Sequence, residues 1–391
     1  MMLATTYVIR QAYLKFKIRV RQWGHLPADR GATVLITNHQ HMDEGETITG
    51  RTFLLHPWKP LVMCNSRRTF ETGFIAARLP FSARFTRGMN LSWLWECLSV
   101  LPIENHLFSR PLISLAEELQ SAHGNLTIDE ILPSETVAEL GLEGRTLSDL
   151  WKLENFQKAQ SWIKLAKLKS PYRREVLENL RAVNERDVAA IVERVRGGAT
   201  FYITPEGDFS RDGRLHSMRN GIVGALAPFA DLWMCAVAYD PFRTGRLSML
   251  YRVVRYDDSA DLGASVAAAR PVTGSALLGT FLFDAPETFT AEDAARSVRA
   301  QLGVLPQNVF VDPEVREDPD AIVADALKEL ARRGTLAAES GRYRLAGERG
   351  DAKFPHVPDM IAFQRNMLEE TVTSARLLDG PARPESNAAG S

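Results

Sequence analysis

The sequence predicts an α/β fold in which helices flank a central sheet, and three observations support this prediction. Short apolar runs, the first of them with β-branched residues, stand at residues 32–37, 61–64, 100–103, 199–204 and 234–239. Such runs are typical of buried strands. Helical patterns separate them, among them residues 187–196, which end at a Gly-Gly pair. Strands that alternate with helices favour an α/β core.

The composition is that of an ordinary globular protein and excludes several classes. The chain has 391 residues, of which 45% are hydrophobic and 24% charged, and its net charge is −1. A chain so close to neutral shows no overall attraction for nucleic acid, and we expect no nucleic-acid partner. Its three cysteines, Cys64, Cys97 and Cys235, have neither disulfide nor zinc-site spacing. A reducing, cytoplasmic compartment is therefore expected.

Residues 1–30 form a basic N-terminal segment with six Lys or Arg residues and one Asp. Aromatic and aliphatic residues are interleaved with these charges, as in helices that lie on an anionic bilayer. The alternative is an amphipathic helix packed on the domain, with its charges in water. The first alternative predicts a peripheral protein on the cytoplasmic face of a membrane. The most apolar window, residues 221–239, is interrupted by Pro228 and Asp231, so a buried strand is expected in its second half.

The domain of residues 31–260 is predicted to contain a helical insertion at about residues 111–186. Residues 151–186 carry nine Lys or Arg against four Glu. A solvated helix face is the favoured interpretation, and a contact with phosphate or membrane is the alternative.

The remainder, residues 261–379, is predicted to be an α+β module. Helical patterns at 291–302 and 321–333 are followed by a hairpin pattern within residues 334–345. This order resembles a winged-helix module, but the segment is not strongly basic, so a structural role is expected. Residues 380–391 are rich in Pro, Ala and Ser and are predicted to be a disordered tail.

Two polar motifs follow predicted strands. The first is Thr-Asn-His-Gln-His-Met-Asp-Glu at 37–44, and the second is Thr-Pro-Glu-Gly-Asp-Phe-Ser-Arg-Asp-Gly-Arg-Leu at 204–215. Ligands bind beyond the carboxyl ends of strands in open α/β sheets, so the two motifs are expected to share one cleft.

The first motif has the groups needed for general base catalysis. His39 could take a proton from an alcohol, and a carboxylate on its other ring nitrogen would fix the tautomer and stabilise the imidazolium. Asp43 and Glu44 are both candidates for this carboxylate. The second motif offers glycines for close backbone approach, a glutamate, and arginines suited to phosphate.

Together the motifs resemble those of the glycerolipid acyltransferase superfamily, which includes glycerol-3-phosphate and lysophosphatidic acid acyltransferases. The family pattern has Asn-His followed by an aspartate, with His-Met-Asp in some members, and later Pro-Glu-Gly-Thr-Arg-Ser-Arg-x-Gly-x-Leu. The resemblance covers roughly residues 15–245, with Arg219 at a later Lys position, and implies an acyltransferase-type central sheet. It identifies His39 and Asp43 as catalytic; the substrate-binding residues would be Glu206, Gly207, Ser210, Arg211, Arg219 and Arg110.

The implied activity is O-acyl transfer without a cofactor or metal. An acyl thioester, either acyl-CoA or acyl carrier protein, would be the donor, and a glycerol phosphate or lysophospholipid would be the acceptor. His39 would deprotonate the acceptor hydroxyl, and backbone amides near Gly207 could stabilise the oxyanion. Glu206 would position the acceptor or brace its loop.

The sequence departs from the family pattern at three places. Only three residues separate His39 from Asp43, so Glu44 stands at the usual aspartate offset; Asp43 is preferred and Glu44 is the alternative. Phe209 replaces an arginine. The middle motif, which in the family ends in a phosphate-binding arginine, has Asn105 at that position, and Arg110 is the nearest substitute.

Two other functions remain open. His39, His41 and Asp43 also resemble part of a metallo-β-lactamase-type zinc motif, which would indicate a metal-dependent hydrolase, although further metal-ligating histidines are hard to find. The altered spacing could instead mark a catalytically inactive lipid-binding homologue.

Overall fold

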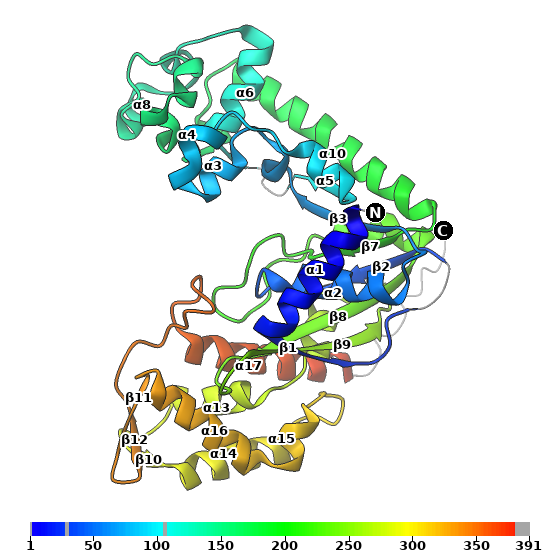
Figure 1. Ribbon diagram of the computed structural model, residues 1–391, viewed down its shortest axis with the longest axis vertical. Helices are drawn as coiled ribbons and strands as arrows, with labels where there is room; N and C mark the ends of the chain where they lie inside the picture. Colours follow the sequence, from blue (N-terminus) through cyan, green and yellow to red (C-terminus); the bar gives the residue numbers. More distant parts are fainter. Residues whose placement is uncertain (1, 28–30, 105–107, 380–391) are drawn as a thin grey trace, which may run out of the picture. The chain divides into compact units, whose positions relative to one another are not determined.

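The computed structural model describes residues 2–27, 31–104 and 108–379 (Figure 1). These residues form two compact units. The sheet unit comprises Leu3–Leu61 together with the chain from Gly198 onward, and the insert unit comprises Val62–Gly197. The predicted tail, residues 380–391, lies outside the described residues.

The fold is α/β, with a mostly parallel seven-stranded central sheet flanked by helices, as predicted. Strand β2 runs parallel to both β7 and β8, and β1 runs parallel to β9, whereas β8 and β9 are antiparallel. The strand order is β1 (Ile18–Trp23), β9 (Leu247–Arg255), β8 (Asp231–Asp240), β2 (Thr33–Ile36), β7 (Thr200–Ile203), β3 (Leu61–Ser66) and β4 (Val100–Ile103).

The central strands are buried along their whole length. Val34, Leu35 and Ile36 of β2 are completely inaccessible, and all four residues of β7 are buried. Parallel strands covered on both faces require continuous apolar runs rather than alternating ones, which is the pattern seen in the sequence. The register places Ile36 beside Ile203 and Met234, so β2 and β7 end at the same level, whereas β8 continues to Asp240.

Two strands of the central sheet were not expected from the sequence. Strand β1 occupies part of the basic N-terminal segment, and β9 follows β8 in a stretch where no strand is predicted. In β1 the charged residues Arg19 and Arg21 are satisfied by ion pairs with Glu314 and Asp312 at 2.5–2.9 Å. Ion pairing of this kind lets an edge strand carry arginines that would otherwise indicate a solvated segment.

Helix α1 (Met2–Lys17) precedes β1 and packs by one face. Leu14 is buried, whereas Ile9, Tyr13 and Phe16 are 65%, 52% and 82% exposed. The N-terminal segment is therefore a helix followed by a sheet strand. Its residues 28–30 lie outside the described part of the chain.

The apolar window of residues 221–239 is divided between α11 (Asn220–Leu226) and β8. No helix among the described residues is both long and apolar enough to span a membrane.

The insert unit is mainly helical around its own apolar core, which includes Leu112, Leu115 and Phe156. Its longest helix, α10 (Tyr172–Arg196), extends the predicted helix of 187–196 toward the N-terminus. The segment 162–164 is a strand, β6, paired with β5 (Ser109–Pro111), so this part of the predicted helical block is corrected. The other helices are α3 (Phe74–Arg78), α4 (Ala83–Thr86), α5 (Ser92–Cys97), α6 (Leu112–His123), α7 (Ile128–Ile131), α8 (Ser134–Leu140) and α9 (Leu153–Phe156).

The C-terminal elements belong to the same compact unit as the sheet. Asp240, the last residue of β8, accepts hydrogen bonds from the amide and hydroxyl of Ser275, and Arg243 contacts Asp325 at 3.1 Å. A small antiparallel sheet has the order β10-β12-β11. The elements are α12 (Leu262–Ala269), α13 (Gly274–Phe283), β10 (Phe289–Thr290), α14 (Ala291–Val304), α15 (Pro313–Glu317), α16 (Pro319–Arg332), β11 (Leu336–Glu339), β12 (Arg342–Leu345) and α17 (Met360–Asp379).

Candidate functional site

His39 is held at the carboxyl edge of the sheet by its neighbour Asn38. The Asn38 side chain donates to the carbonyl of Val237 at 2.9 Å and accepts from the amide of Val237 at 2.7 Å. These bonds continue the pairing of β2 with β8 beyond Ile36, using a side chain in place of backbone. The chain leaves the sheet at His39, whose side chain is 23% exposed.

The carboxylate beside His39 is that of Glu44. Its Oε2 lies 3.1 Å from His39 Nδ1, and its Oε1 accepts the amides of Gln40 and His41, each at 2.8 Å. Glu44 is completely buried, and this burial raises its pKa, while the histidine and the two amides act in the opposite direction. His39 Nε2 forms no hydrogen bond with any described residue. The pair therefore has the arrangement of a base with its orienting acid.

The preference for Asp43 as the partner of His39 was wrong. Asp43 is buried and pairs with Lys17 at 2.8 Å and with His41 Nδ1 at 3.3 Å. Asp43 and Glu44 are the first two residues of helix α2 (Asp43–Leu55). Successive helical side chains point about 100° apart, so only one of the two can turn back toward His39. That residue is Glu44, at the usual family offset.

Glu206 joins the two motifs. One of its carboxylate oxygens accepts the amide of His39 at 2.6 Å, and the other accepts the amide of His216 at 3.0 Å. In return, the amide of Ser210 donates to the His39 carbonyl at 3.0 Å. Burial raises the pKa of Glu206 to about 7 despite the two amide donors. Glu206 is thus a brace for the loop that carries the Pro-Glu-Gly motif.

Ser210, predicted to bind substrate, is instead used inside the loop. It is 1% exposed, its hydroxyl donates to the carbonyl of Arg214 at 2.7 Å, and it accepts the amide of Gly213 at 3.0 Å. Gly213 has a φ of 89°, and a side chain there would come within 2.0 Å of the Phe363 carbonyl. These contacts fix the turn that presents the arginines of the motif.

Gly207 has a φ of 74°, and an added Cβ would lie 3.1 Å from the Arg219 guanidinium carbon. A glycine there allows Arg219 to lie directly against the backbone. The amide of Gly207 is occupied by the Thr204 carbonyl at 3.1 Å and that of Phe209 by the Asp208 side chain at 2.8 Å. In this loop, the amide of Asp208 has no hydrogen-bond partner among the described residues.

The arginines of the second motif differ in their partners. Arg214 is paired with Glu369 of α17 at 2.7 Å. Arg211 and Arg219 are exposed and form no ion pair within the described part of the chain. Their guanidinium groups are therefore available to an anionic ligand.

Phe209, which lies beside His39, and His356, which lies beside Phe209, were not anticipated as site residues. The Phe209 ring lies 4.1 Å from the His39 ring and 5.1 Å from that of His356, measured between centroids. His356 Nε2 is 3.0 Å from the carbonyl of Gln40, and burial lowers the pKa of His356. The residue that replaces a family arginine thus packs against the candidate base. Nothing in the motif indicates His356, which is more than 300 positions away along the chain.

Helix α17 contacts the second motif through Glu370. Glu370 accepts the amide of Leu215 at 3.0 Å and pairs with Arg270 at 2.7 Å, and Arg270 donates to the carbonyl of Gly213 at 3.1 Å. Arg270 is 1% exposed. These contacts are tertiary and have no local sequence signal.

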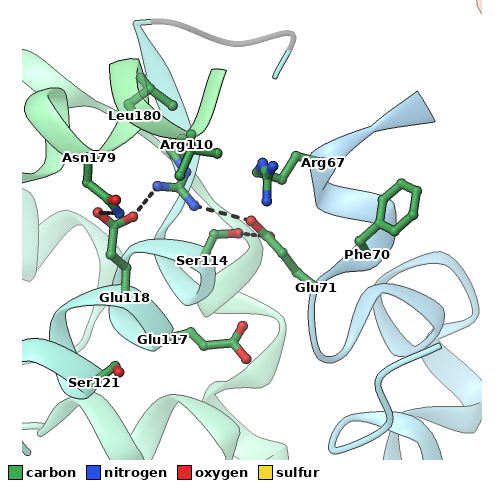
Figure 2. Close-up of a pocket in the computed structure, with 11 residues that line it drawn as sticks. Arg67, Phe70, Glu71, Arg110, Ser114, Glu117, Glu118, Ser121, Asn179 and Leu180 are labelled. Atoms are coloured by element: carbon green, nitrogen blue, oxygen red, sulfur yellow. Dashed lines mark hydrogen bonds and ion pairs between the residues drawn. The ribbon is translucent and has the colours of Figure 1, made fainter. Parts of the chain in front are cut away.

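Arg110, the predicted substitute for the phosphate-binding arginine, belongs to the insert unit. It is 8% exposed and lies between Glu118 and Glu71, pairing with both (Figure 2). Ser114 also donates to Glu71. These groups line a cavity of about 330 Å³. The Arg110 guanidinium is therefore paired with two carboxylates, unlike the guanidinium groups of Arg211 and Arg219.

The alternative metal motif does not assemble in the described residues. His41 is buried, with Nδ1 near Asp43 and Nε2 3.1 Å from the carbonyl of Lys353. Across residues 2–27, 31–104 and 108–379, no three His, Cys, Asp or Glu side chains are grouped so as to hold a metal ion.

The sequence was compared with models of protein families and with curated proteins. No family model matches it, and no curated protein gives a significant match.

Proposed function

We propose that this chain is an O-acyltransferase that transfers a fatty acyl group from a thioester to a hydroxyl of a phosphorylated glycerolipid precursor. The observation that carries the proposal is the His39–Glu44 pair at the carboxyl edge of the sheet. The amide and the carbonyl of His39 are both hydrogen-bonded to the loop of the Pro-Glu-Gly motif. A base held against a loop with two unpaired arginines suits an anionic alcohol as the acceptor.

In the proposed reaction, His39 Nε2 takes the proton of the acceptor hydroxyl. The oxygen attacks the thioester carbonyl and forms a tetrahedral oxyanion. Collapse of this intermediate breaks the C–S bond, and the thiolate leaves with the proton carried by the imidazolium. Glu44 keeps Nδ1 protonated and stabilises the imidazolium between these steps. No covalent enzyme intermediate is needed, because the acceptor itself is the nucleophile.

The other residues of the edge have supporting roles in this proposal. Arg211 and Arg219 bind the acceptor phosphate through charge-assisted hydrogen bonds. The free amide of Asp208 is the loop's candidate donor to the oxyanion. Glu206 and Ser210 act through the loop they brace and do not contact substrate.

We infer that the protein works at a cytoplasmic membrane surface as a peripheral protein. The outward face of α1 supports this, because Ile9, Tyr13 and Phe16 are all more than half exposed. Helices α14 and α16 followed by the β11–β12 hairpin have the order of a winged-helix-like module. We assign it a structural role, since Asp325 of α16 pairs with Arg243 and Arg333 donates to the carbonyl of Pro241, both just beyond β8.

The proposal is tested by thiol release from a long-chain acyl-CoA, with glycerol 3-phosphate and lysophosphatidate supplied separately. Wild type is compared with His39→Ala and with His25→Ala, a matched change of an exposed histidine. We expect acceptor-dependent release that falls about 10²- to 10⁴-fold in His39→Ala and is unchanged in His25→Ala. Release without acceptor would indicate a thioesterase, and equal rates in all three proteins would rule out His39 as the base.

A further inference from the structure

A second cationic site lies in the sheet unit, where the chain enters β9. Arg19, Arg243, Thr244, Arg246 and Ser248 line a cavity of about 190 Å³, which we call the arginine pocket. None of these residues belongs to the two motifs. Three guanidinium groups and two hydroxyls are the donors that proteins use to bind phosphate.

The hydroxyl of Ser248 indicates that the arginine pocket is built for a ligand. Ser248 is 3% exposed, and its Oγ makes no hydrogen bond with any described residue. Buried hydroxyls nearly always have a partner, because an unsatisfied one destabilises the fold. A phosphate oxygen in the pocket would supply the missing partner.

Acidic residues around the arginine pocket pair with two of its three guanidinium groups. Arg19 contacts Glu314 at 2.7 Å, and Arg243 contacts Asp325 at 3.1 Å, Glu314 at 3.4 Å and Asp240 at 4.0 Å. Arg246 pairs with no acidic residue that the structure describes. The neighbouring acids hold Arg19 and Arg243 in place, and Arg246 supplies positive charge that is not neutralised.

The arginine pocket is joined to helix α1. Arg246 Nη1 donates to the carbonyl of Lys15, in the last turn of the helix. The exposed residues Ile9, Tyr13 and Phe16 are spaced by four and three positions, so they lie on one face of α1. A helix with an exposed apolar face and basic neighbours is typical of one that lies in the surface of a bilayer.

We propose that the arginine pocket binds the phosphate of an anionic membrane lipid while the outward face of α1 enters the bilayer surface. The apolar face supplies affinity for any bilayer, and the arginine pocket selects lipids whose phosphate is accessible, such as phosphatidate. This inference concerns membrane recognition. Its test needs no acyl donor. The inference can therefore fail while the proposed acyl transfer stands, and the proposed acyl transfer can fail while the inference stands.

The test is flotation of the full chain with phosphatidylcholine vesicles, with or without phosphatidate. The variants are Arg246→Ala and Arg255→Ala. Arg255 is a matched control at the other end of β9, where it is 72% exposed and pairs with Asp231. We expect Arg246→Ala to weaken binding to phosphatidate vesicles at least tenfold, as loss of charge-assisted hydrogen bonds should. Arg255→Ala should weaken it less than about fivefold, the effect of one general surface charge.

Three further arms make the outcome decisive. Phe16→Ser should lower binding to both kinds of vesicle, whereas Arg246→Lys, which keeps the charge but loses the planar fork, should still lose most of the preference for phosphatidate. Thermal melting of each variant checks that it is folded. Equal losses in Arg246→Ala and Arg255→Ala would overturn the proposal in favour of general charge. Displacement by millimolar inorganic phosphate, at matched ionic strength, would overturn the assignment to lipid.

Discussion

The two units both contain clusters of arginine and carboxylate, but the clusters are built differently. In the insert unit, Arg110 lies between Glu71 and Glu118, so its charge is neutralised within the protein. At the edge of the sheet unit, Arg211 and Arg219 have no acidic partner among the described residues. His39 Nε2 likewise forms no hydrogen bond with any described residue. The charge of Arg110 is thus neutralised by neighbouring carboxylates, whereas the charges of Arg211 and Arg219 are not.

This difference separates a structural role from a binding role. A buried ion-pair network stabilises a unit only while all its members are present. An exposed arginine without a partner contributes little to folding but can form bidentate bonds with phosphate. Changes of Arg211 or Arg219 should therefore reduce activity at constant stability, and changes of Arg110 should reduce stability with little direct effect on the reaction.

Among variants that keep His39, the largest effect is expected from a change of its carboxylate partner. Glu44→Gln keeps the size of the side chain but removes the charge that orients and stabilises the imidazolium, so transfer should fall on the order of 10²-fold. Asp43→Asn, one residue away, should reduce transfer only a few-fold, because Asp43 faces Lys17 and His41. Initial rates of acceptor-dependent thiol release measure both. A greater loss in Asp43→Asn would restore the assignment made from sequence.

The second effect separates the two arginine clusters directly. Arg219→Ala should raise the acceptor KM about tenfold with the melting temperature unchanged, because its guanidinium is exposed and unpaired. Arg110→Ala should lower the free energy of unfolding by about 3 kcal/mol, since it leaves the largely buried Glu118 without a cation and Glu71 with Arg68 alone. Steady-state kinetics and denaturant unfolding of both variants give the comparison. A raised KM with normal stability in Arg110→Ala would assign the phosphate site to the insert unit.

The smallest effect concerns Glu206 and pH. Its pKa in the folded protein is raised to about 7 from 4.5, so the folded state binds more protons than the unfolded state between these values. The stabilisation is present below pH 4.5 and is lost as pH rises toward 7, by up to about 3 kcal/mol. Glu206→Gln should remove this slope while lowering overall stability, because an amide offers only one acceptor oxygen. Unfolding curves at several pH values measure how the free energy of unfolding depends on pH. The same dependence in wild type and Glu206→Gln would contradict a raised pKa of Glu206.

The fold was predictable where local pattern and burial agree. Strands β2 and β7 are short, β-branched and buried on both faces, and both were expected within a residue or so. Strand β1 was missed because its arginines resemble a solvated segment until their partners, Asp312 and Glu314, are known. Those partners are almost 300 positions away, and no local pattern reports them.

The candidate site was predictable only to its first residues. The motifs indicated His39 and the loop of Glu206, but the choice between Asp43 and Glu44 depends on the direction of two adjacent side chains at a helix start. Phe209 was noted only as a missing arginine, although its ring packs on His39. Glu370 contacts the loop from a helix at the far end of the sequence. These are tertiary relations, which spacing along the chain does not encode.

Identifying the product is the most direct test of whether this chain transfers an acyl group with His39 as the base. Wild type and His39→Ala would be incubated with a labelled long-chain acyl-CoA, glycerol 3-phosphate and lysophosphatidate, in the presence of vesicles, and the lipids analysed by mass spectrometry. We expect an acylated glycerophospholipid formed in equal amount with free CoA by wild type, and almost none by His39→Ala. Free fatty acid as the sole product, or the same acylated lipid from both proteins, would contradict it.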